Sequence, residues 1–396
     1  MKTSQIEKLY AEYILPTYSR VPFCVVKGKG IKVWDLNGRE YLDFFPGWAV
    51  SGLGHCHPEV VNAIKDQARK VLHVPNNFLN IKQAQLAQEI IKSSFPGRIF
   101  FGNSGAEATD GAVKFARKYG HDSGRYEIIT FQRSFHGRSL AAIAATGQEK
   151  VQKGFDPLVQ GFRYAVLNDI ESVKKQLSEK SVAVFLEPIQ GEGGINVATQ
   201  EFMRALKKIC DERDMLFMVD EVQTCMGRTG KMFAYQHYGF EPDVMTLAKS
   251  LGGGVPIGAL VVHNRIKKEV FGPGTHGSTY GGNPLVCAAG LAVFRAIRKE
   301  RLLKKAVEMG DYLGAQLAAL QKDFAVITAI KGMALMRGVE LSIPGAPIVD
   351  AARAKGLLIN CTQDTVLRIM PPLIVTKKQI DQAVKILREV VGESKK

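Results

Sequence analysis

Short apolar runs alternate with longer amphipathic stretches through the middle of the chain, from about residue 54 to residue 276. The runs have the length of buried strands, and the stretch 200–212 between two of them places Phe202, Leu206 and Ile209 on one helical face. This alternation is typical of an α/β fold with a mostly parallel sheet and helices on both sides. We expect strands at 98–101, 127–131, 182–187, 215–220, 244–248 and 259–262.

The length and the patterns near both ends predict two domains. At 396 residues the chain is long for one hydrophobic core and suits a large domain with a smaller one. Asn37-Gly38 lies between two apolar stretches and predicts a β-hairpin. We expect residues 54–283 to form the large domain, and 1–53 together with 284–396 to form a small α+β domain.

Cysteine usage and hydropathy indicate the compartment. No apolar run approaches a membrane span, and the first residues lack a signal-peptide core. The stretch 55–57, His-Cys-His, has no further ligands at suitable spacing, so we expect no metal site. No C-x-x-C pair occurs among the cysteines, which favours a reducing, cytoplasmic location; they are Cys24, Cys56, Cys210, Cys225, Cys287 and Cys361.

The net charge of +15 raises the question of an anionic partner. Much of the excess lies in helical stretches such as 295–305, where basic residues are interleaved with apolar ones, as on a solvated helix face. No nucleic-acid-binding signature accompanies it, so we expect no nucleic-acid partner. A basic nucleic-acid-binding protein on this fold is the alternative from another class, and salt-dependent DNA binding would indicate it.

Two of the expected strands end in residues of opposite charge. Asp220 closes the run 215–220, and Lys249 follows the run 244–248. In an open α/β sheet the carboxyl ends of the strands face the ligand crevice, so both side chains should reach it. A lysine and an aspartate placed this way suit pyridoxal 5′-phosphate, because the amine bonds the aldehyde and the carboxylate keeps the pyridine nitrogen protonated. An ordinary buried ion pair is the alternative interpretation.

The sequence around these two residues resembles the class III (ω-amino acid) aminotransferases, a branch of the fold-type-I pyridoxal phosphate enzymes. The motifs are Asp220-Glu221-Val222-Gln223, Gly227-Arg228-Thr229-Gly230, Lys249 and the glycine-rich 252–258. The resemblance runs in register from about Tyr13 to about Leu387. It implies a fold-type-I transferase in which both termini contribute to the small domain.

The stretch 100–108 predicts a phosphate site. A strand ends there, a turn of small residues follows, and a helix begins at Ser104-Gly105-Ala106, where backbone N–H groups and a hydroxyl bind an anion. A plain N-cap by Ser104 is the alternative. The resemblance implies that Ser104, Gly105 and Ala106 form the phosphate cup, and that Thr279 reaches the phosphate of the neighbouring subunit in an obligatory homodimer.

The resemblance also assigns the residues around the cofactor ring. Lys249 and Asp220 are the catalytic pair. Phe135, in Ser134-Phe135-His136-Gly137-Arg138, stacks on one ring face, and Val222 packs on the other. Gln223 hydrogen-bonds the phenolic oxygen of the ring.

The substrate-binding residues implied by the resemblance come from distant parts of the chain. Arg138 holds the distal carboxylate of the substrate, and Tyr18 and Ser278 contribute to the same site. Glu187 shields Arg368 by a salt bridge while an ω-amine donor is bound, and the pair opens when 2-oxoglutarate or glutamate presents its α-carboxylate. A purely structural bridge between Glu187 and Arg368 is the alternative.

Within the class, the stretches 15–18, 147–155 and 356–361 most resemble members that act on N-acetylornithine. They imply transfer of the δ-amino group of N-acetyl-L-ornithine to 2-oxoglutarate by a ping-pong mechanism, giving N-acetyl-L-glutamate 5-semialdehyde and L-glutamate in arginine biosynthesis. Ornithine, N-succinylornithine and N-succinyl-diaminopimelate are the alternative donors.

Some residues depart from the class pattern. Cys225 stands where relatives usually carry glycine, so we expect backbone strain if that position requires a positive φ. Pro46 and Trp48 replace the usual serine and small aliphatic residue in a stretch near the substrate. Substrate preference is therefore expected to depend on this stretch.

Overall fold

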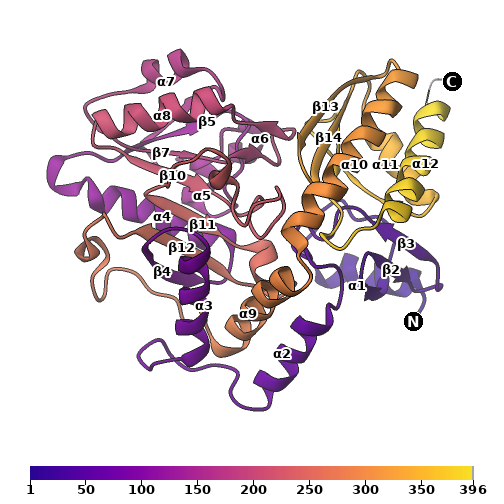
Figure 1. Ribbon diagram of the computed structural model, residues 1–396, viewed down its shortest axis with the longest axis horizontal. Coiled ribbons are helices and arrows are strands. Elements are labelled where there is room, and N and C mark those ends of the chain that lie inside the picture. The colour runs from indigo at the N-terminus through magenta and orange to yellow at the C-terminus, as the bar shows by residue number, and fades with distance from the viewer. Residues whose placement is uncertain (395–396) are drawn as a thin grey trace.

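The computed structural model describes residues 1–394 and is built around a seven-stranded sheet (Figure 1). Its order is β4-β12-β11-β10-β7-β5-β6, in which β12 runs antiparallel to both neighbours and the other pairs are parallel. The prediction of a mostly parallel sheet is confirmed. The strands are β4 (Gly97–Gly102), β5 (Glu127–Phe131), β6 (Phe162–Ala165), β7 (Ser181–Leu186), β10 (Leu216–Asp220), β11 (Val244–Leu247) and β12 (Gly258–His263).

Helices cover both faces of this sheet because its central strands are buried on both sides. On one face, Phe115 of α4 (Gly105–Tyr119) packs with Phe185 and Met218. On the other, Phe202 and Leu206 of α8 belong to a second cluster of buried side chains. The flanking helices are α5 (Leu140–Ala145), α6 (Glu149–Gln152), α7 (Ile170–Gln176) and α8 (Gln200–Glu212), and the short strands β8 (Ile189–Gln190) and β9 (Asn196–Val197) pair nearby.

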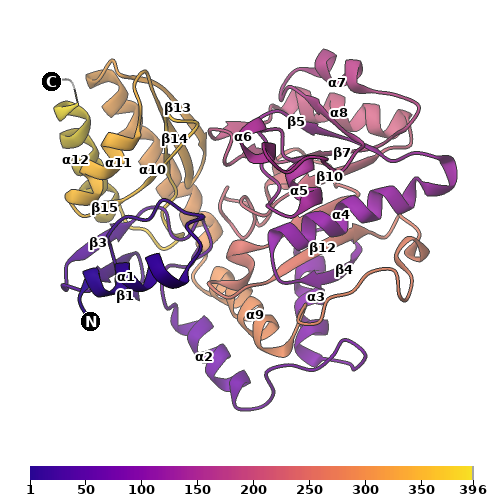
Figure 2. The same ribbon diagram turned by 180° about the vertical axis from the view of Figure 1, so that it is seen from behind.

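The amino-terminal and carboxyl-terminal segments of the chain lie together beside the large sheet (Figures 1 and 2). One four-stranded sheet has the order β1-β2-β3-β15, so Leu42 near the amino terminus pairs with Leu357. The expected hairpin at Asn37-Gly38 joins β2 to β3. The strands are β1 (Val25–Lys29), β2 (Lys32–Asp35), β3 (Glu40–Asp43) and β15 (Leu357–Leu358).

A second four-stranded sheet, β13-β14-β17-β16, lies beside the first and is covered by helices of the carboxyl-terminal third. Its strands are β13 (Ile327–Met333), β14 (Met336–Leu341), β16 (Asn360–Thr362) and β17 (Val366–Ile369), and the helices are α10 (Leu302–Asp323), α11 (Ala346–Ala354) and α12 (Lys377–Glu393). The connecting helices are α2 (Pro58–Ala68), α3 (Ile81–Ser93) and α9 (Pro284–Lys299), and α1 (Thr3–Tyr13) buries no residue. Short 3-10 helices are η1 (His121–Ser123), η2 (Ala234–His237), η3 (Lys249–Gly252) and η4 (Lys268–Phe271).

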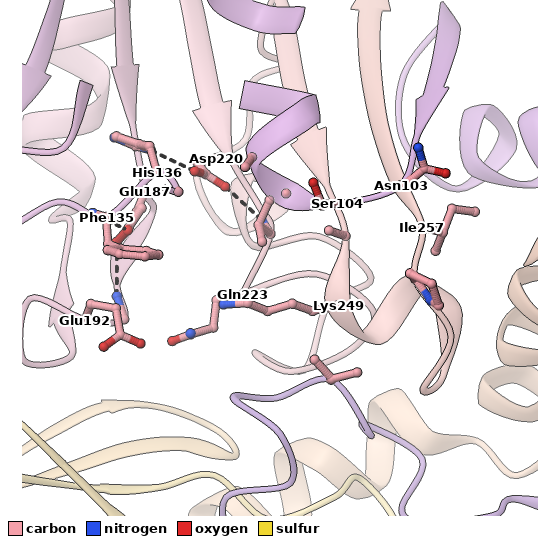
Figure 3. A pocket seen from close by; sticks show the side chains of 18 of the residues that line it. Asn103, Ser104, Phe135, His136, Glu187, Glu192, Asp220, Gln223, Lys249 and Ile257 are labelled. Carbon is pink, nitrogen blue, oxygen red and sulfur yellow. Dashed lines mark hydrogen bonds and ion pairs between the residues drawn. The ribbon is translucent and has the colours of Figure 1, made fainter. Parts of the chain in front are cut away.

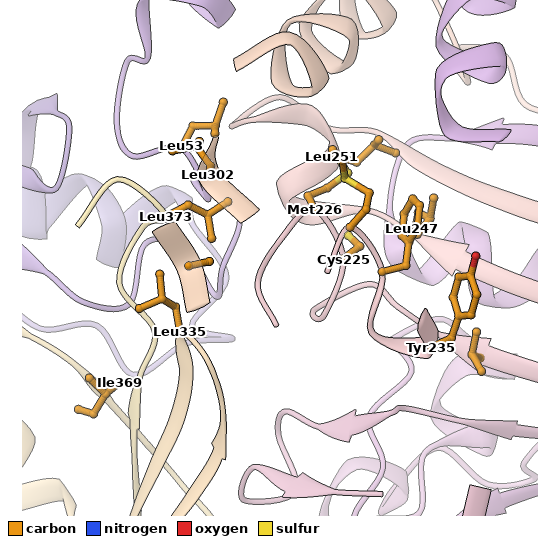
Figure 4. Close-up of a cluster of buried hydrophobic side chains, with 14 of the residues drawn as sticks. Leu53, Cys225, Met226, Tyr235, Leu247, Leu251, Leu302, Leu335, Ile369 and Leu373 are labelled. Atoms are coloured by element: carbon orange, nitrogen blue, oxygen red, sulfur yellow. The ribbon is translucent and has the colours of Figure 1, made fainter. Parts of the chain in front are cut away.

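One continuous apolar cluster joins the two parts of the molecule (Figure 4). Leu302, Leu335 and Leu373 of the terminal part belong to the same cluster as Met226 and Leu251 of the part that contains Lys249. Burial of this area is the main source of attraction between the two parts. Among the described residues, no helix is long and apolar enough to cross a membrane.

Candidate active site

A cavity of about 430 Å³ opens at the carboxyl ends of β7, β10 and β11 (Figure 3). This is the edge at which the sequence predicted a ligand crevice. Asn103, His136 and Glu192 also line the cavity, although no role was predicted for them from the sequence. The predicted site residues that line it are Ser104, Gly105, Ala106, Phe135, Glu187, Asp220, Val222, Gln223 and Lys249.

Lys249 begins η3 directly after β11 and its neighbour Ala248. Its φ of 47° is left-handed, a conformation that strains residues other than glycine and often marks a functional position. Burial lowers the pKa of the Lys249 amine, and the positive charge of Arg368 acts in the same direction, while Glu192 opposes it. The amine is therefore more readily deprotonated than an exposed lysine.

Asp220 is the last residue of β10 and is fixed by three hydrogen bonds. Its Oδ2 lies 2.7 Å from Nδ1 of His136. Its Oδ1 accepts from the N–H of Val222 at 3.0 Å and from the hydroxyl of Thr246 at 3.1 Å. The His136 ring is buried and stacks on Phe185, which limits the orientations of the carboxylate.

The turn before α4 has the form of an anion site. Ser104 is the N-cap of α4, and its hydroxyl accepts from the N–H of Glu107 at 3.2 Å. Gly105 and Ala106 begin the helix, where N–H groups lack intrahelical partners. Gly258 of β12 approaches the turn so closely that an added Cβ would lie 2.2 Å from the carbonyl oxygen of Ser104.

The lining fits pyridoxal phosphate by several independent features. The N-terminus of α4 presents donors to a phosphate, and buried Asp220 presents a carboxylate to a ring nitrogen. Oε1 of Gln223 is buried and has no hydrogen-bond partner among the described residues, as expected of a group that waits for a ligand. Phe135 and Val222 supply apolar surface for the ring faces. Fold and site therefore define a pyridoxal-phosphate-dependent transferase of fold type I.

Arg368 is buried on β17, and its ion-pair partner differs from the one expected. Nη1 of Arg368 donates to Oε1 of Glu192 at 2.5 Å, and the expected pair with Glu187 is not found among the described residues. The two oxygens of Glu187 instead accept from the N–H groups of Phe135 and Gly191, both at 3.1 Å. Burial, reinforced by the charge of Asp220, raises the pKa of Glu187 well above its usual value, so the neutral acid is favoured at that position.

The remaining predicted residues lie outside the cavity lining. Arg138 is exposed, with its guanidinium carbon 5.6 Å from the ring centroid of Phe135. Ser278 accepts through Oγ from the amide of Asn103 at 3.1 Å, which places it beside the phosphate turn. Tyr18 and Thr279 are exposed on the surface of the chain.

The conformational strain expected at Cys225 falls on its neighbour. Met226 and Gly227 have φ values of 59° and 90°, whereas Cys225 is not among the residues with positive φ. Burial raises the pKa of the Cys225 thiol, so the neutral form is favoured. Trp48 has a φ of 56°, and its ring packs edge-on against Phe45.

Comparison with known proteins gives the family. The model for class-III aminotransferases matches residues 13–391. The chain is 52% identical over 386 residues to the acetylornithine aminotransferase of Caldanaerobacter subterraneus subsp. tengcongensis, a match that covers 96% of this chain and 98% of that protein. It is 48% identical over 395 residues to that of Methanocaldococcus jannaschii, covering 98% of each. The chain therefore belongs to the class-III aminotransferase family and is a pyridoxal-phosphate-dependent enzyme.

Solved structures show the same architecture. The ornithine aminotransferase from Toxoplasma gondii superposes with a TM-score of 0.95 at 30% sequence identity, covering 100% of this chain and 96% of that one. The acetylornithine aminotransferase from Elizabethkingia anophelis gives a TM-score of 0.87 at 29% identity, covering 99% and 100%. The fold-type-I class predicted from the sequence is confirmed.

Proposed function

We propose that the protein is an acetylornithine aminotransferase. It transfers the δ-amino group of N-acetyl-L-ornithine to 2-oxoglutarate and gives N-acetyl-L-glutamate 5-semialdehyde and L-glutamate in two half-reactions at one site, as a step of arginine biosynthesis. The observation that carries the proposal is the Glu192–Arg368 pair at the cavity that holds Lys249. The extensive identity to enzymes of that name supports the choice of donor.

The residues around the cavity have distinct tasks in this reaction. Pyridoxal phosphate, when bound, supplies an electron sink for the carbon that carries the amine. Ser104, Gly105 and Ala106 hold its phosphate, and Phe135 and Val222 enclose its ring. Asp220, oriented by His136, keeps the ring nitrogen protonated, and Gln223 hydrogen-bonds the phenolic oxygen.

Lys249 moves the proton between the substrate and the cofactor. Its lowered pKa favours the neutral amine, and in that form Nζ can accept a proton from the reacting carbon. Nζ then returns the proton on the cofactor side of the cavity. The same residue performs both transfers in each half-reaction, so one lysine accounts for both directions of the exchange.

The substrates differ in charge near the reacting carbon, and we propose that Glu192 resolves this difference. With the ω-amine donor bound, Glu192 neutralises Arg368, while Arg138 holds the donor's distal carboxylate and Tyr18 and Ser278 line the same site. With 2-oxoglutarate bound, Glu192 moves aside and Arg368 pairs with the α-carboxylate. Glu192 replaces Glu187 as the residue proposed for this exchange.

A homodimer completes the proposed site. Thr279 is exposed in the loop before α9, and we propose that it contacts the cofactor phosphate of the neighbouring subunit. Asn76 and Asn80 hydrogen-bond the loop 278–282 that contains Thr279, so the segment around them lies on the same side of the molecule. Exposed apolar side chains on this side support an interface there; these side chains are Phe78, Leu79, Ile81 and Tyr280.

We further propose a cytoplasmic location.

We also propose a division of the chain into two domains. Residues 1–53 and 284–396 form the small domain, and residues 54–283 form the large one. The pairing of β3 with β15 supports a shared terminal domain, because it joins the two ends of the chain in one sheet.

Single-turnover kinetics test the proposed donor. The purified holoenzyme is mixed without 2-oxoglutarate with N-acetylornithine, ornithine, N-succinylornithine or 4-aminobutyrate, and loss of the cofactor's visible absorbance is followed. N-acetylornithine is expected to react well ahead of ornithine. Preference for another donor would refute the assignment while leaving the family unaffected.

A further inference from the structure

The guanidinium of Arg368 is held on three sides. Nε and Nη2 both donate to Oδ1 of Asn360, at 2.9 and 2.5 Å. Nη1 donates to Glu192 and, at 3.3 Å, to the carbonyl of Gly191. The ring of Phe45 lies over the group, with its centroid 4.6 Å from Cζ. Arg368 is only 1% exposed, so these contacts fix its plane and its rotation.

Asn360 occupies one defined edge of the arginine. A guanidinium has five N–H donors arranged in forks that match a carboxylate, and the fork made by Nε and Nη2 is taken by the asparagine. The other fork, made by Nη1 and Nη2, is the one that Glu192 touches. When Glu192 moves aside, this second fork is left for an incoming carboxylate.

The backbone of Glu192 is held by residues at the end of β16, the strand that also carries Asn360. The carbonyl of Glu192 accepts from the hydroxyl of Thr362 at 2.6 Å and from the amide of Gln363 at 2.8 Å. The preceding N–H, of Gly191, is bound by Glu187. Exchange of the arginine's partner therefore requires only rotation of the Glu192 side chain, which is 24% exposed while the arginine is buried.

We infer that Asn360 is a positioning residue for the acceptor substrate: it directs the Nη1–Nη2 edge of Arg368 toward the α-carboxylate of a 2-oxo dicarboxylate. This inference rests on the proposed use of Arg368 by the acceptor but not by the donor. A neutral amide suits the task because it satisfies two donors without cancelling the arginine's charge. A carboxylate at position 360 would pair permanently with Arg368 and compete with the substrate.

Two variants and one control test the role of Asn360. Asn360→Ala removes both hydrogen bonds, and Asn360→Asp keeps the shape but adds a charge. Cys361→Ala is the matched control, because this neighbour on β16 faces Gly345, where an added Cβ would lie 2.6 Å from its sulfur. The two half-reactions are measured separately by single-turnover absorbance, and binding of glutarate to each holoenzyme is measured by calorimetry.

Asn360→Ala is expected to raise the KM for 2-oxoglutarate and the Kd of glutarate at least about tenfold, because hydrogen bonds to a charged group are lost. The donor half-reaction with N-acetylornithine should change by less than about twofold, since Arg368 is then covered by Glu192. Asn360→Asp is expected to weaken the binding of 2-oxoglutarate more than Asn360→Ala does. Cys361→Ala should behave as the wild type in every measurement.

Two results would overturn the inference. One is an unchanged KM and Kd in Asn360→Ala, and the other is an equal loss in both half-reactions, which would show a merely structural role. If Asn360→Ala does not bind cofactor, the isosteric Asn360→Asp decides by the same comparison. A wild-type enzyme that does not react with N-acetylornithine would instead refute the proposed function, so the two failures are distinguishable.

Discussion

Lys249 combines two unusual properties at one position, a left-handed backbone and a buried amine with a lowered pKa. The strained backbone is maintained by the packing of η3 and of Leu251, which is fully buried in the core. The amine therefore reaches the cavity from a fixed point, as a group that transfers protons requires.

Replacing Lys249 by alanine is expected to lower turnover at least about 1,000-fold, because no other amine in the cavity lining can move the proton. Steady-state rates with N-acetylornithine and 2-oxoglutarate measure the effect. Lys231→Ala, a change of an exposed lysine in the same part of the chain, is the control and should retain full activity. Substantial turnover in Lys249→Ala would contradict the assigned role.

Glu221, next to Asp220, contributes to pH-dependent stability. Its buried carboxyl accepts from the hydroxyl of Thr224 and from the N–H of Tyr235 at 2.6 Å. Burial raises the pKa of Glu221 to about 7. The folded protein thus keeps a proton that the unfolded chain releases above its ordinary carboxyl pKa. The resulting stability is complete below that pKa and is lost as the pH rises through 7.

Glu221→Gln stays neutral at every pH. When the pH is raised from 4.5 to 8, its free energy of unfolding should therefore increase relative to that of the wild type by on the order of 3 kcal/mol. Denaturant unfolding of both proteins at the two pH values measures it. Glu212→Gln, at the exposed end of α8, is the control. A difference between the two proteins that is the same at both pH values would show that Glu221 does not titrate in this range.

Glu192 illustrates the limit of inference from single residues. Glu187 and Glu192 lie five positions apart at the end of the same strand and turn, and the sequence analysis assigned the arginine partner to Glu187. The structure gives that role to Glu192, because β8 and the turn after it bring its side chain to Arg368. His136 was likewise quoted only as part of a motif, although its position between Phe135 and Arg138 was a usable signal.

At the scale of elements, strand ends and helix starts position the chemistry. Local patterns predicted these elements well: α8 spans 200–212 and β5 spans 127–131, as expected. The local sequence did not predict β6, a four-residue edge strand that is only partly buried. It also gave no sign that β12 runs antiparallel, since direction depends on the connection and not on the strand's own residues.

β12 lies so close to the turn at Ser104 that position 258 is not expected to tolerate a residue larger than glycine. Gly258→Ala is expected to lower the free energy of unfolding by about 1–3 kcal/mol and to weaken cofactor binding, because the methyl group would displace the backbone of Ser104. Thermal unfolding and cofactor titration measure the two effects. Gly272→Ala is the control, since an added Cβ there would lie 3.8 Å from the nearest atom. Normal cofactor affinity in Gly258→Ala would contradict the proposed phosphate cup.

At the scale of the whole molecule, the exposed segment before and at the start of α3 supports the proposed homodimer. Leu79 is fully exposed, and its neighbours Phe78 and Ile81 are exposed as well. Such a group of apolar side chains is costly in water and is typical of an interface. The net charge of +15 has no structural explanation beyond solvated helix faces.

Leu79→Asp is expected to weaken dimerisation at least about 100-fold, because it places a charge in an apolar contact. Sedimentation velocity over a range of concentrations measures the effect, and cofactor occupancy should fall with dissociation because Thr279 would be lost from the neighbouring site. Val166→Asp is the control, at an exposed position whose N–H donates to the hydroxyl of Ser172 in α7. A Leu79→Asp protein that remains dimeric would exclude this segment as the interface.

The sequence by itself determined the α/β class, the positions of Asp220 and Lys249 at strand ends and the turn at Ser104 where α4 begins, because each depends on residues close together in the chain. Only the tertiary structure decided which glutamate pairs with Arg368, that Asn360 holds the arginine's other edge and that His136 orients Asp220. These contacts join residues that are 8 to 176 positions apart. They depend on how separate elements pack, and packing over such distances leaves no periodic signal in the local sequence.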